Sequence, residues 1–122
     1  PVDFHLDPDD SQLAEFYQTA DIFLLTSIPN RRSIEGFGLV YLEAAAFGLP
    51  CVAYQTGGVS EAIRDKETGV LLPAGRVDLL AAELQNYYEN HETYKTMGQR
   101  GRKLVLSGNW NKVARASLSM VP

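Results

Sequence analysis

The chain has 122 residues, a formal net charge of −4 and a single cysteine. This length suits one domain, over residues 1–122, and is too short for two. The negative balance argues against nucleic acid as a partner, because binding to phosphate backbones needs basic surfaces. One cysteine excludes an internal disulfide framework and fits a reducing compartment, and no apolar run approaches the roughly 20 residues of a membrane span. We therefore expect a cytoplasmic globular domain.

The amino-terminal residues combine a strand-like pattern with a helix start. The chain begins with Pro1 rather than methionine, so we expect a fragment of a longer chain. Apolar residues alternate over Val2–Leu6, which predicts a short strand. The run Asp7-Pro8-Asp9 matches a D-x-D pattern that can hold a metal-bound diphosphate, but acids also collect at helix starts, where they cap free amides. We favour the capping role, because helical spacing of apolar residues predicts a helix over about Asp10–Thr19.

Three short apolar runs predict strands that are buried on both faces, namely Ile22–Leu25, Cys51–Tyr54 and Val70–Leu72. Helical patterns alternate with these runs, which predicts an α/β fold with a parallel sheet. After residue 76, apolar and aromatic residues recur at helical spacing and predict the packing faces of the tail helices. These residues are Val77, Leu80, Leu84, Tyr87 and Tyr88, then Tyr94, Met97, Gly101, Leu104 and Val105, and then Trp110, Val113, Ala114 and Leu118.

The central stretch, Glu35–Pro50, carries the first candidate site. It opens with the run Glu35-Gly36-Phe37-Gly38 and continues as an apolar helix that a glycine and a proline bring to an end. Glycines let a backbone turn approach a ligand closely, and the start of the following helix offers free amides to an anion such as phosphate. Glu43 is an acid on this otherwise apolar helix. A buried carboxylate is costly unless something bonds it, and a ribose or sugar diol would do so.

A second glycine turn, Thr56-Gly57-Gly58, follows the predicted strand Cys51–Tyr54 and leads into a short predicted helix over Val59–Arg64. A Gly-Gly pair by itself indicates only a turn, although this geometry also suits an anion. Both glycine turns come after a predicted strand, and ligands bind at the carboxyl ends of strands in open α/β sheets. Cys51 lies in a strand without a basic neighbour, so we expect an inert core thiol.

Several sequence blocks follow one another in a characteristic order. They are Tyr17-x-x-Ala20-Asp21-Ile22-Phe23-Leu24-Leu25-Thr26-Ser27, Glu35-Gly36-Phe37-Gly38-Leu39-Val40-x-Leu42-Glu43-Ala44, Gly48-x-Pro50, Gly57-Gly58-x-x-Glu61, Thr68-Gly69 and Trp110-x-x-Val113-Ala114. This order resembles the C-terminal, donor-binding domain of GT-B fold glycosyltransferases of the retaining, group 1 type, whose signature is two glutamates separated by seven residues. The resemblance implies a partial Rossmann-like parallel sheet flanked by helices, that is, a truncated C-terminal domain.

The resemblance also implies a role for each candidate site residue. Glu35 would hydrogen-bond a hydroxyl of the donor sugar, Glu43 would accept from both ribose hydroxyls, and Val40 would pack near the nucleoside. Four consecutive amides would face the sugar and the diphosphate, those of Gly36, Phe37, Gly38 and Leu39. Gly57 and Gly58 would shape the cleft between donor and acceptor.

The reaction that the resemblance implies is hexosyl transfer from a nucleotide-diphospho-sugar to an acceptor hydroxyl, with retention at the anomeric carbon. Stabilising the charge on the leaving diphosphate would be the main task, met by basic side chains and amides. We expect no metal and no cofactor. Glu35 is the catalytic candidate only in the sense that it positions the donor sugar, and we assign no nucleophile.

Parts of the family pattern lie outside this sequence, including an upstream βαβ unit with basic residues and an N-terminal domain that binds the acceptor sugar or lipid-linked sugar. We therefore expect the fragment alone to be inactive, and the full-length protein to be cytoplasmic or peripheral at the membrane. A short sheet of about four strands would leave an exposed edge that favours a homodimer. Two alternatives stay open: a non-catalytic binding or dimerisation module, and a sugar-nucleotide epimerase of the same fold.

Overall fold

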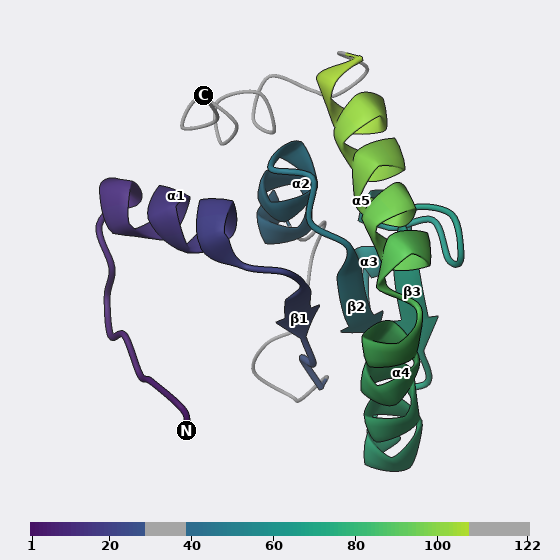
Figure 1. Cartoon of the computed structure of the whole chain (residues 1–122). Helices are drawn as coiled ribbons and strands as arrows, with labels where there is room; N and C mark the ends of the chain where they lie inside the picture. The colour runs from purple at the N-terminus through teal and green to yellow at the C-terminus, as the bar shows by residue number, and fades with distance from the viewer. Residues whose placement is uncertain (29–38, 108–122) are drawn as a thin grey trace.

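A computed structural model describes residues 1–28 and 39–107 of the chain, and shows a three-stranded parallel sheet flanked by helices (Figure 1). The strand order is β1-β2-β3, with Phe23 opposite Cys51 and Cys51 opposite Gly69 in the register. The elements are α1 (Asp10–Thr19), β1 (Phe23–Leu25), α2 (Leu39–Ala46), β2 (Cys51–Tyr54), α3 (Val59–Ala62), β3 (Gly69–Leu72), α4 (Val77–Glu89) and α5 (His91–Leu106). The predicted α/β class and parallel sheet are confirmed.

The start of α1 confirms the capping role of the acidic run. The side chain of Asp9 accepts a hydrogen bond from the backbone N–H of Gln12 at 2.8 Å, and the side chain of Gln12 accepts one from the N–H of Asp9 at 3.0 Å. This reciprocal pair is a capping box, which satisfies two amides that the helix itself cannot pair. The helix then runs over Asp10–Thr19, as its apolar spacing predicts.

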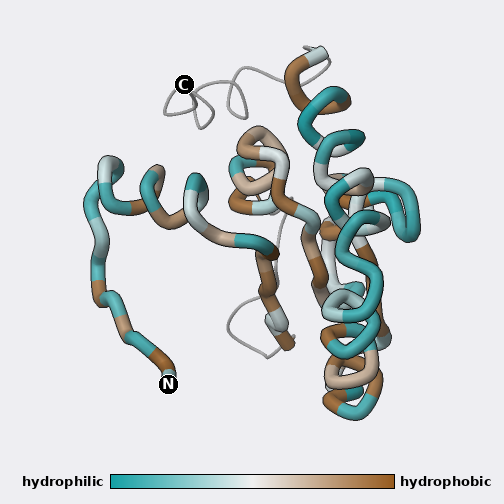
Figure 2. Tube along the Cα trace, viewed as in Figure 1, coloured by the Kyte–Doolittle hydropathy of each residue, from teal (hydrophilic) through white to brown (hydrophobic). Residues whose placement is uncertain are grey.

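The central strand, β2, divides the core into two hydrophobic clusters. All four residues of β2 are buried, and successive side chains point to opposite faces of the sheet. Cys51 and Ala53 belong to the cluster under α1, α2 and α3, whereas Val52 and Tyr54 belong to the cluster under α4 and the start of α5. The hydropathy colouring shows that the strand segments are mostly apolar (Figure 2).

The predicted strand over Val2–Leu6 is not formed. Val2, Phe4 and Leu6 are exposed by 77%, 84% and 90%, and the segment runs away from the sheet (Figure 1). An alternating pattern becomes a strand only where a neighbouring strand offers hydrogen bonds, and in residues 1–28 and 39–107 no strand lies beside this segment. The sheet of the described residues therefore has three strands rather than four.

Two predictions of burial are also wrong. Ile22–Leu25 was expected to be buried on both faces, but β1 is an edge strand and Leu24 is 40% exposed. On α4, Val77 and Tyr88 are exposed by 68% and 74%, because only one face of this helix contacts the core. The short helix after the second glycine turn also ends earlier than predicted, at Ala62. The predicted stripe from Trp110 to Leu118 lies outside the described residues.

The carboxyl end of α2 is fixed by α5. The guanidinium of Arg102 donates a hydrogen bond to the carbonyl of Ala46, in the last turn of α2, where a cation is favourable. Gly98 lies against the loop that follows α2, so closely that a Cβ atom there would be 2.1 Å from the carbonyl oxygen of Gly48. Because α5 continues past the sheet onto α2, it contributes to both clusters, with Met97 in one and Val105 in the other (Figure 1).

We predict that Gly98→Ala destabilises the protein by about 1–3 kcal/mol, because the new methyl group would force α5 away from a backbone that cannot yield locally. Gly101→Ala is the matched control on the same helix. A Cβ at Gly101 would meet its nearest atom, Cβ of Ala45, at an ordinary 3.5 Å, so this change should be neutral or stabilising. Urea unfolding of both variants measures the difference, and equal stability would contradict the packing described here.

We further predict that the Cys51 thiol does not react in the native protein. Its side chain is 2% exposed, and burial raises its pKa to about 12, so the reactive thiolate is scarce at neutral pH. A thiol reagent at pH 8 should modify the protein only after denaturant unfolds it, and the signal is unambiguous because this is the single cysteine. Modification of the folded protein at the rate of a free cysteine would refute the assignment.

Candidate functional site

The structure describes five of the predicted site residues, on two neighbouring segments. Leu39, Val40 and Glu43 lie on α2, and Gly57 and Gly58 form the turn between β2 and α3. The other four candidates fall outside the described residues; they are Glu35, Gly36, Phe37 and Gly38. The roles proposed for these four therefore stay predictions.

Helix α2, which contains the predicted site residues Leu39, Val40 and Glu43, is strongly apolar. Helices α2 and α3 are in contact, and Leu39 and Val40 pack against the cluster that contains Val59 and Ala62 of α3. Since α3 directly follows the second glycine turn, this contact brings the two predicted segments of the site together. The tertiary structure thus joins residues that are about 15 positions apart in the sequence.

The second glycine turn lies at the carboxyl end of β2, as predicted. Gly57 has φ +52, which favours glycine, and Gly58 is the N-cap of α3. The hydroxyl of the buried Thr56 donates to the carbonyl of Ser27 at 3.5 Å, which links the segments that follow β2 and β1. Because α3 is only one turn long, its few aligned peptides add little to anion binding.

Glu43, the acid on the apolar helix, is half-buried and has a partner within the protein. Its Oε2 accepts a hydrogen bond from the hydroxyl of Tyr17 on α1 at 3.1 Å. Burial raises the pKa of the Glu43 carboxyl, the Tyr17 hydroxyl opposes this by stabilising the carboxylate, and the nearby Asp10 raises the pKa again. Burial and the adjacent carboxylate raise the pKa of Tyr17 as well, so this phenol stays protonated and donates.

Aromatic rings hold Tyr17 in place. Its ring stacks on that of Phe47, with centroids 5.3 Å apart and planes at 23°, and lies 6.0 Å from the ring of Phe23. Phe23 in turn meets Tyr41 of α2 edge to face at 5.8 Å. Such pairs add to the energy of burial and fix ring orientation. The hydroxyl of Tyr17 is thereby aimed at α2.

Tyr17 belongs to the first of the resemblance blocks, but its bond to Glu43 was not predicted from the sequence. The two residues are 26 positions apart, on different helices, and no local spacing predicts such a contact. Because Tyr17 satisfies one oxygen of Glu43, this carboxylate does not depend on a ligand alone for a partner.

A second buried acid, Glu83 on α4, offers a useful contrast. One of its oxygens accepts from the hydroxyl of Tyr94, and the other lies 4.0 Å from Nζ of Lys66. The amide of Asn86 also donates to Tyr94 at 2.9 Å. Both oxygens of Glu83 thus have partners from the protein, as expected of a structural carboxylate that joins α4, α5 and the turn before β3.

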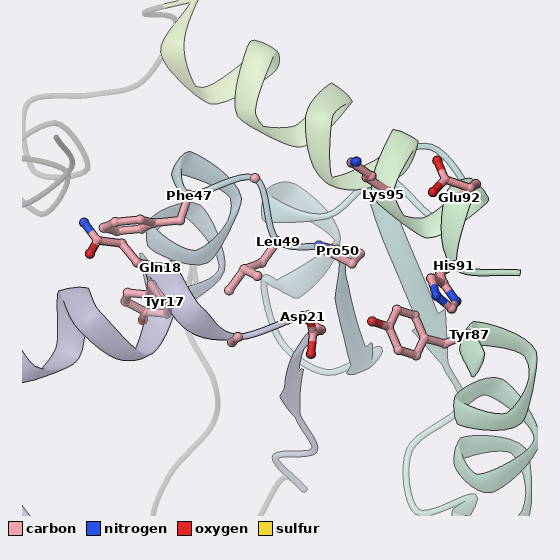
Figure 3. A pocket seen from close by; sticks show the side chains of 12 residues that line it. Tyr17, Gln18, Asp21, Phe47, Leu49, Pro50, Tyr87, His91, Glu92 and Lys95 are labelled. Atoms are coloured by element: carbon pink, nitrogen blue, oxygen red, sulfur yellow. The ribbon is translucent and has the colours of Figure 1, made fainter.

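A pocket of about 370 Å³ opens at the opposite, amino end of the strands (Figure 3). Asp21 and Pro50 line it just before β1 and β2, and His91 and Lys95 line it from the start of α5. Tyr17 and Phe47, which pack together beside Glu43, also line this pocket (Figure 3). Sequence analysis predicted no site here. In the described ranges no cluster of three or more histidine, cysteine or acidic side chains could hold a metal ion. Every helix in these ranges is too short or too polar to cross a bilayer.

Comparison with protein families finds a match over residues 1–104 to the family described as Glycosyl transferases group 1. A D-inositol 3-phosphate glycosyltransferase of Paenarthrobacter aurescens is 35% identical over 107 residues, which are 88% of this chain and 25% of that protein. A GDP-mannose-dependent alpha-(1-6)-phosphatidylinositol monomannoside mannosyltransferase of Mycolicibacterium smegmatis is 33% identical over 104 residues, or 81% of this chain and 26% of that protein.

Solved structures show the same fold. The C-terminal domain of the group 1 glycosyl transferase LpcC from Francisella tularensis superposes with a TM-score of 0.72 at 27% identity, over 88% of this chain and 51% of that chain. HepE from Anabaena, in a complex with UDP-glucose, matches with a TM-score of 0.71 at 24% identity, over 93% of this chain and 29% of that chain, which is a likeness of fold.

The chain spans about a quarter of the length of these curated relatives. The structural neighbours confirm the GT-B type of fold, as the part that forms a C-terminal domain. With the family match over residues 1–104, they establish that the chain belongs to the Glycosyl transferases group 1 family.

Proposed function

We propose that the chain is the donor-binding part of a retaining glycosyltransferase that moves a hexosyl group from a nucleotide-diphospho-sugar to an acceptor hydroxyl. The observation that carries this proposal is the half-buried Glu43, an ionisable acid on the apolar helix α2, whose Oε2 accepts a hydrogen bond from the hydroxyl of Tyr17. A perturbed acid of this kind, in a family of glycosyltransferases, is a candidate for substrate recognition.

The nucleotide part of the proposal concerns the ribose. A carboxylate can accept hydrogen bonds at two oxygens, and a ribose diol offers two hydroxyl donors. In the part of the chain that the structure describes, the protein bonds Oε2 of Glu43 and makes no hydrogen bond to Oε1. A relative that is 33% identical is named as dependent on GDP-mannose, which supports a nucleoside diphosphate donor for this chain too.

The part of the proposal that concerns the sugar and the diphosphate is based on the residues that precede α2 in the sequence. Glu35 would orient the donor sugar, and the amides from Gly36 to Leu39 would face the diphosphate. Charge grows on the leaving diphosphate in the transition state, so amides and basic side chains would supply the stabilisation, without a metal ion. Since the chain spans about a quarter of its curated relatives, the basic residues and the acceptor site would belong to a longer protein, and this part alone would not catalyse transfer.

A second candidate function, a non-catalytic module that forms dimers, is favoured by the edge of the sheet. Strand β1 pairs with β2 on one side, and in the described ranges no strand pairs with its other side. Leu24 at this edge and Phe4 before it are exposed apolar side chains. An unpaired edge of this kind can add a strand from a second copy.

We predict that Glu43→Gln weakens binding of UDP and GDP by about tenfold or more, because the amide loses the charge that strengthens hydrogen bonds from the ribose hydroxyls and keeps only one accepting oxygen. Glu15→Gln, an exposed glutamate on α1, is the matched control and should bind like the wild type. Calorimetry with both nucleotides measures the effect. In a longer protein that carries this chain, undiminished transfer by the Glu43 variant would disprove the ribose assignment.

For the dimer candidate, we predict that Leu24→Lys converts a concentration-dependent dimer into a monomer, because a charge at a strand edge opposes edge pairing. Sedimentation of the wild type and the variant over a range of concentrations measures their masses in solution and shows whether each forms a dimer. A wild type that stays monomeric throughout would eliminate this candidate.

A further inference from the structure

We infer that Tyr17 is a positioning residue for Glu43: its hydroxyl holds one carboxylate oxygen so that the other is presented to the ribose diol. This inference rests on the donor-binding function proposed above and adds to it a second residue, on a different helix, that governs nucleotide affinity. Tyr17 does not itself touch the ligand, and acts through the orientation and charge of Glu43.

The geometry that carries the inference joins α1 to α2. The hydroxyl of Tyr17 lies 3.1 Å from Oε2 of Glu43, and the Tyr17 side chain is 5% exposed. Its ring is stacked on Phe47, directly after α2, and flanked by Phe23 on β1. A ring held from two elements leaves its hydroxyl little freedom to point elsewhere, so Oε2 of Glu43 has a fixed anchor.

A fixed anchor matters because a glutamate side chain is flexible. A free carboxylate samples many rotamers and loses that freedom when a ligand binds, whereas an anchored one has lost it before binding. A comparison with Glu83 supports the view that one oxygen of Glu43 is anchored and the other is available to a ligand. Both oxygens of Glu83 face protein partners, but the described residues bond only one oxygen of Glu43.

The same bond favours the charged form of Glu43. Burial and the Asp10 carboxylate both raise the pKa of Glu43, and among the described residues the Tyr17 hydroxyl lowers it. In the described parts of the chain, the titratable groups that act on Glu43 are thus Tyr17 and Asp10 of α1, and the buried Cys51 thiol of β2 acts electrostatically on Tyr17. Loss of the hydroxyl should therefore raise the pKa of the carboxyl further.

The test is Tyr17→Phe, which removes the hydroxyl and keeps the ring that packs on Phe47. Tyr88→Phe is the matched control, because Tyr88 is 74% exposed and on α4. The first measurement needs no ligand: a ¹³C NMR titration of the Glu43 carboxyl should show a higher pKa in Tyr17→Phe than in the wild type and in Tyr88→Phe. Urea unfolding checks that the variant is folded.

The second measurement is calorimetry with UDP and 2′-deoxy-UDP. The wild type should prefer UDP, and Tyr17→Phe should bind UDP about tenfold more weakly, the factor that corresponds to one hydrogen bond. Its preference for UDP over the deoxy nucleotide should shrink, which a purely structural tyrosine would not cause. Binding of the deoxy nucleotide should change less.

The outcomes separate the two proposals. If the wild type and Glu43→Gln both bind UDP and 2′-deoxy-UDP equally, or neither binds, the ribose role of Glu43 fails and the role of Tyr17 in binding fails with it. If the wild type prefers UDP and Glu43→Gln does not, but Tyr17→Phe keeps the full preference or leaves the pKa of Glu43 unchanged, the donor-binding function survives and the role of Tyr17 is overturned.

Discussion

The close approach of α5 to the loop after α2 is the constraint on which the rest of the structure depends. Gly98 has no side chain, so the helix backbone can lie directly against Gly48 and Pro50, and Arg102 one turn later bonds the carboxyl end of α2. Gly48, with φ +79, ends α2 locally, and the contacts with α5 fix the position of this end against the core. With α2 fixed in this way, its opposite side meets α1, and the contact between Glu43 and Tyr17 becomes possible.

The position of Glu43 shows how this scaffold supports chemistry. An acid on an apolar helix costs free energy when it is half-buried, and folding tolerates it because Tyr17 compensates part of that cost. Glu83 is also buried, and partners from the protein for both of its oxygens compensate the cost of burial. Among residues 1–28 and 39–107, Glu83 has partners for both oxygens and Glu43 for one, and this difference separates a structural acid from a candidate ligand-binding acid.

Much of the fold could be predicted from local patterns. The capping box of Asp9 and Gln12 is a short-range signal, and helix α1 has the predicted bounds. Strand β2 is buried throughout, as its apolar run indicates, because it is central in the sheet. The segment Val2–Leu6 has a similar alternating signal but no adjacent strand, and Leu24 is exposed because β1 lies at an edge. The local pattern therefore predicts a tendency to form a strand, whereas the neighbouring strands and helices determine which residues are buried.

By itself, the sequence determined the α/β class, the glycine turn at Gly57, and Glu43 as the acid to examine, since these depend on residue type and short spacing. Only the tertiary structure decided that Tyr17 bonds Glu43 across 26 positions, that α2 and α3 bring the two site segments together, and that a pocket opens at the amino end of the strands. The physical reason is that such contacts arise from the packing of whole helices against the sheet, which no short stretch of sequence encodes.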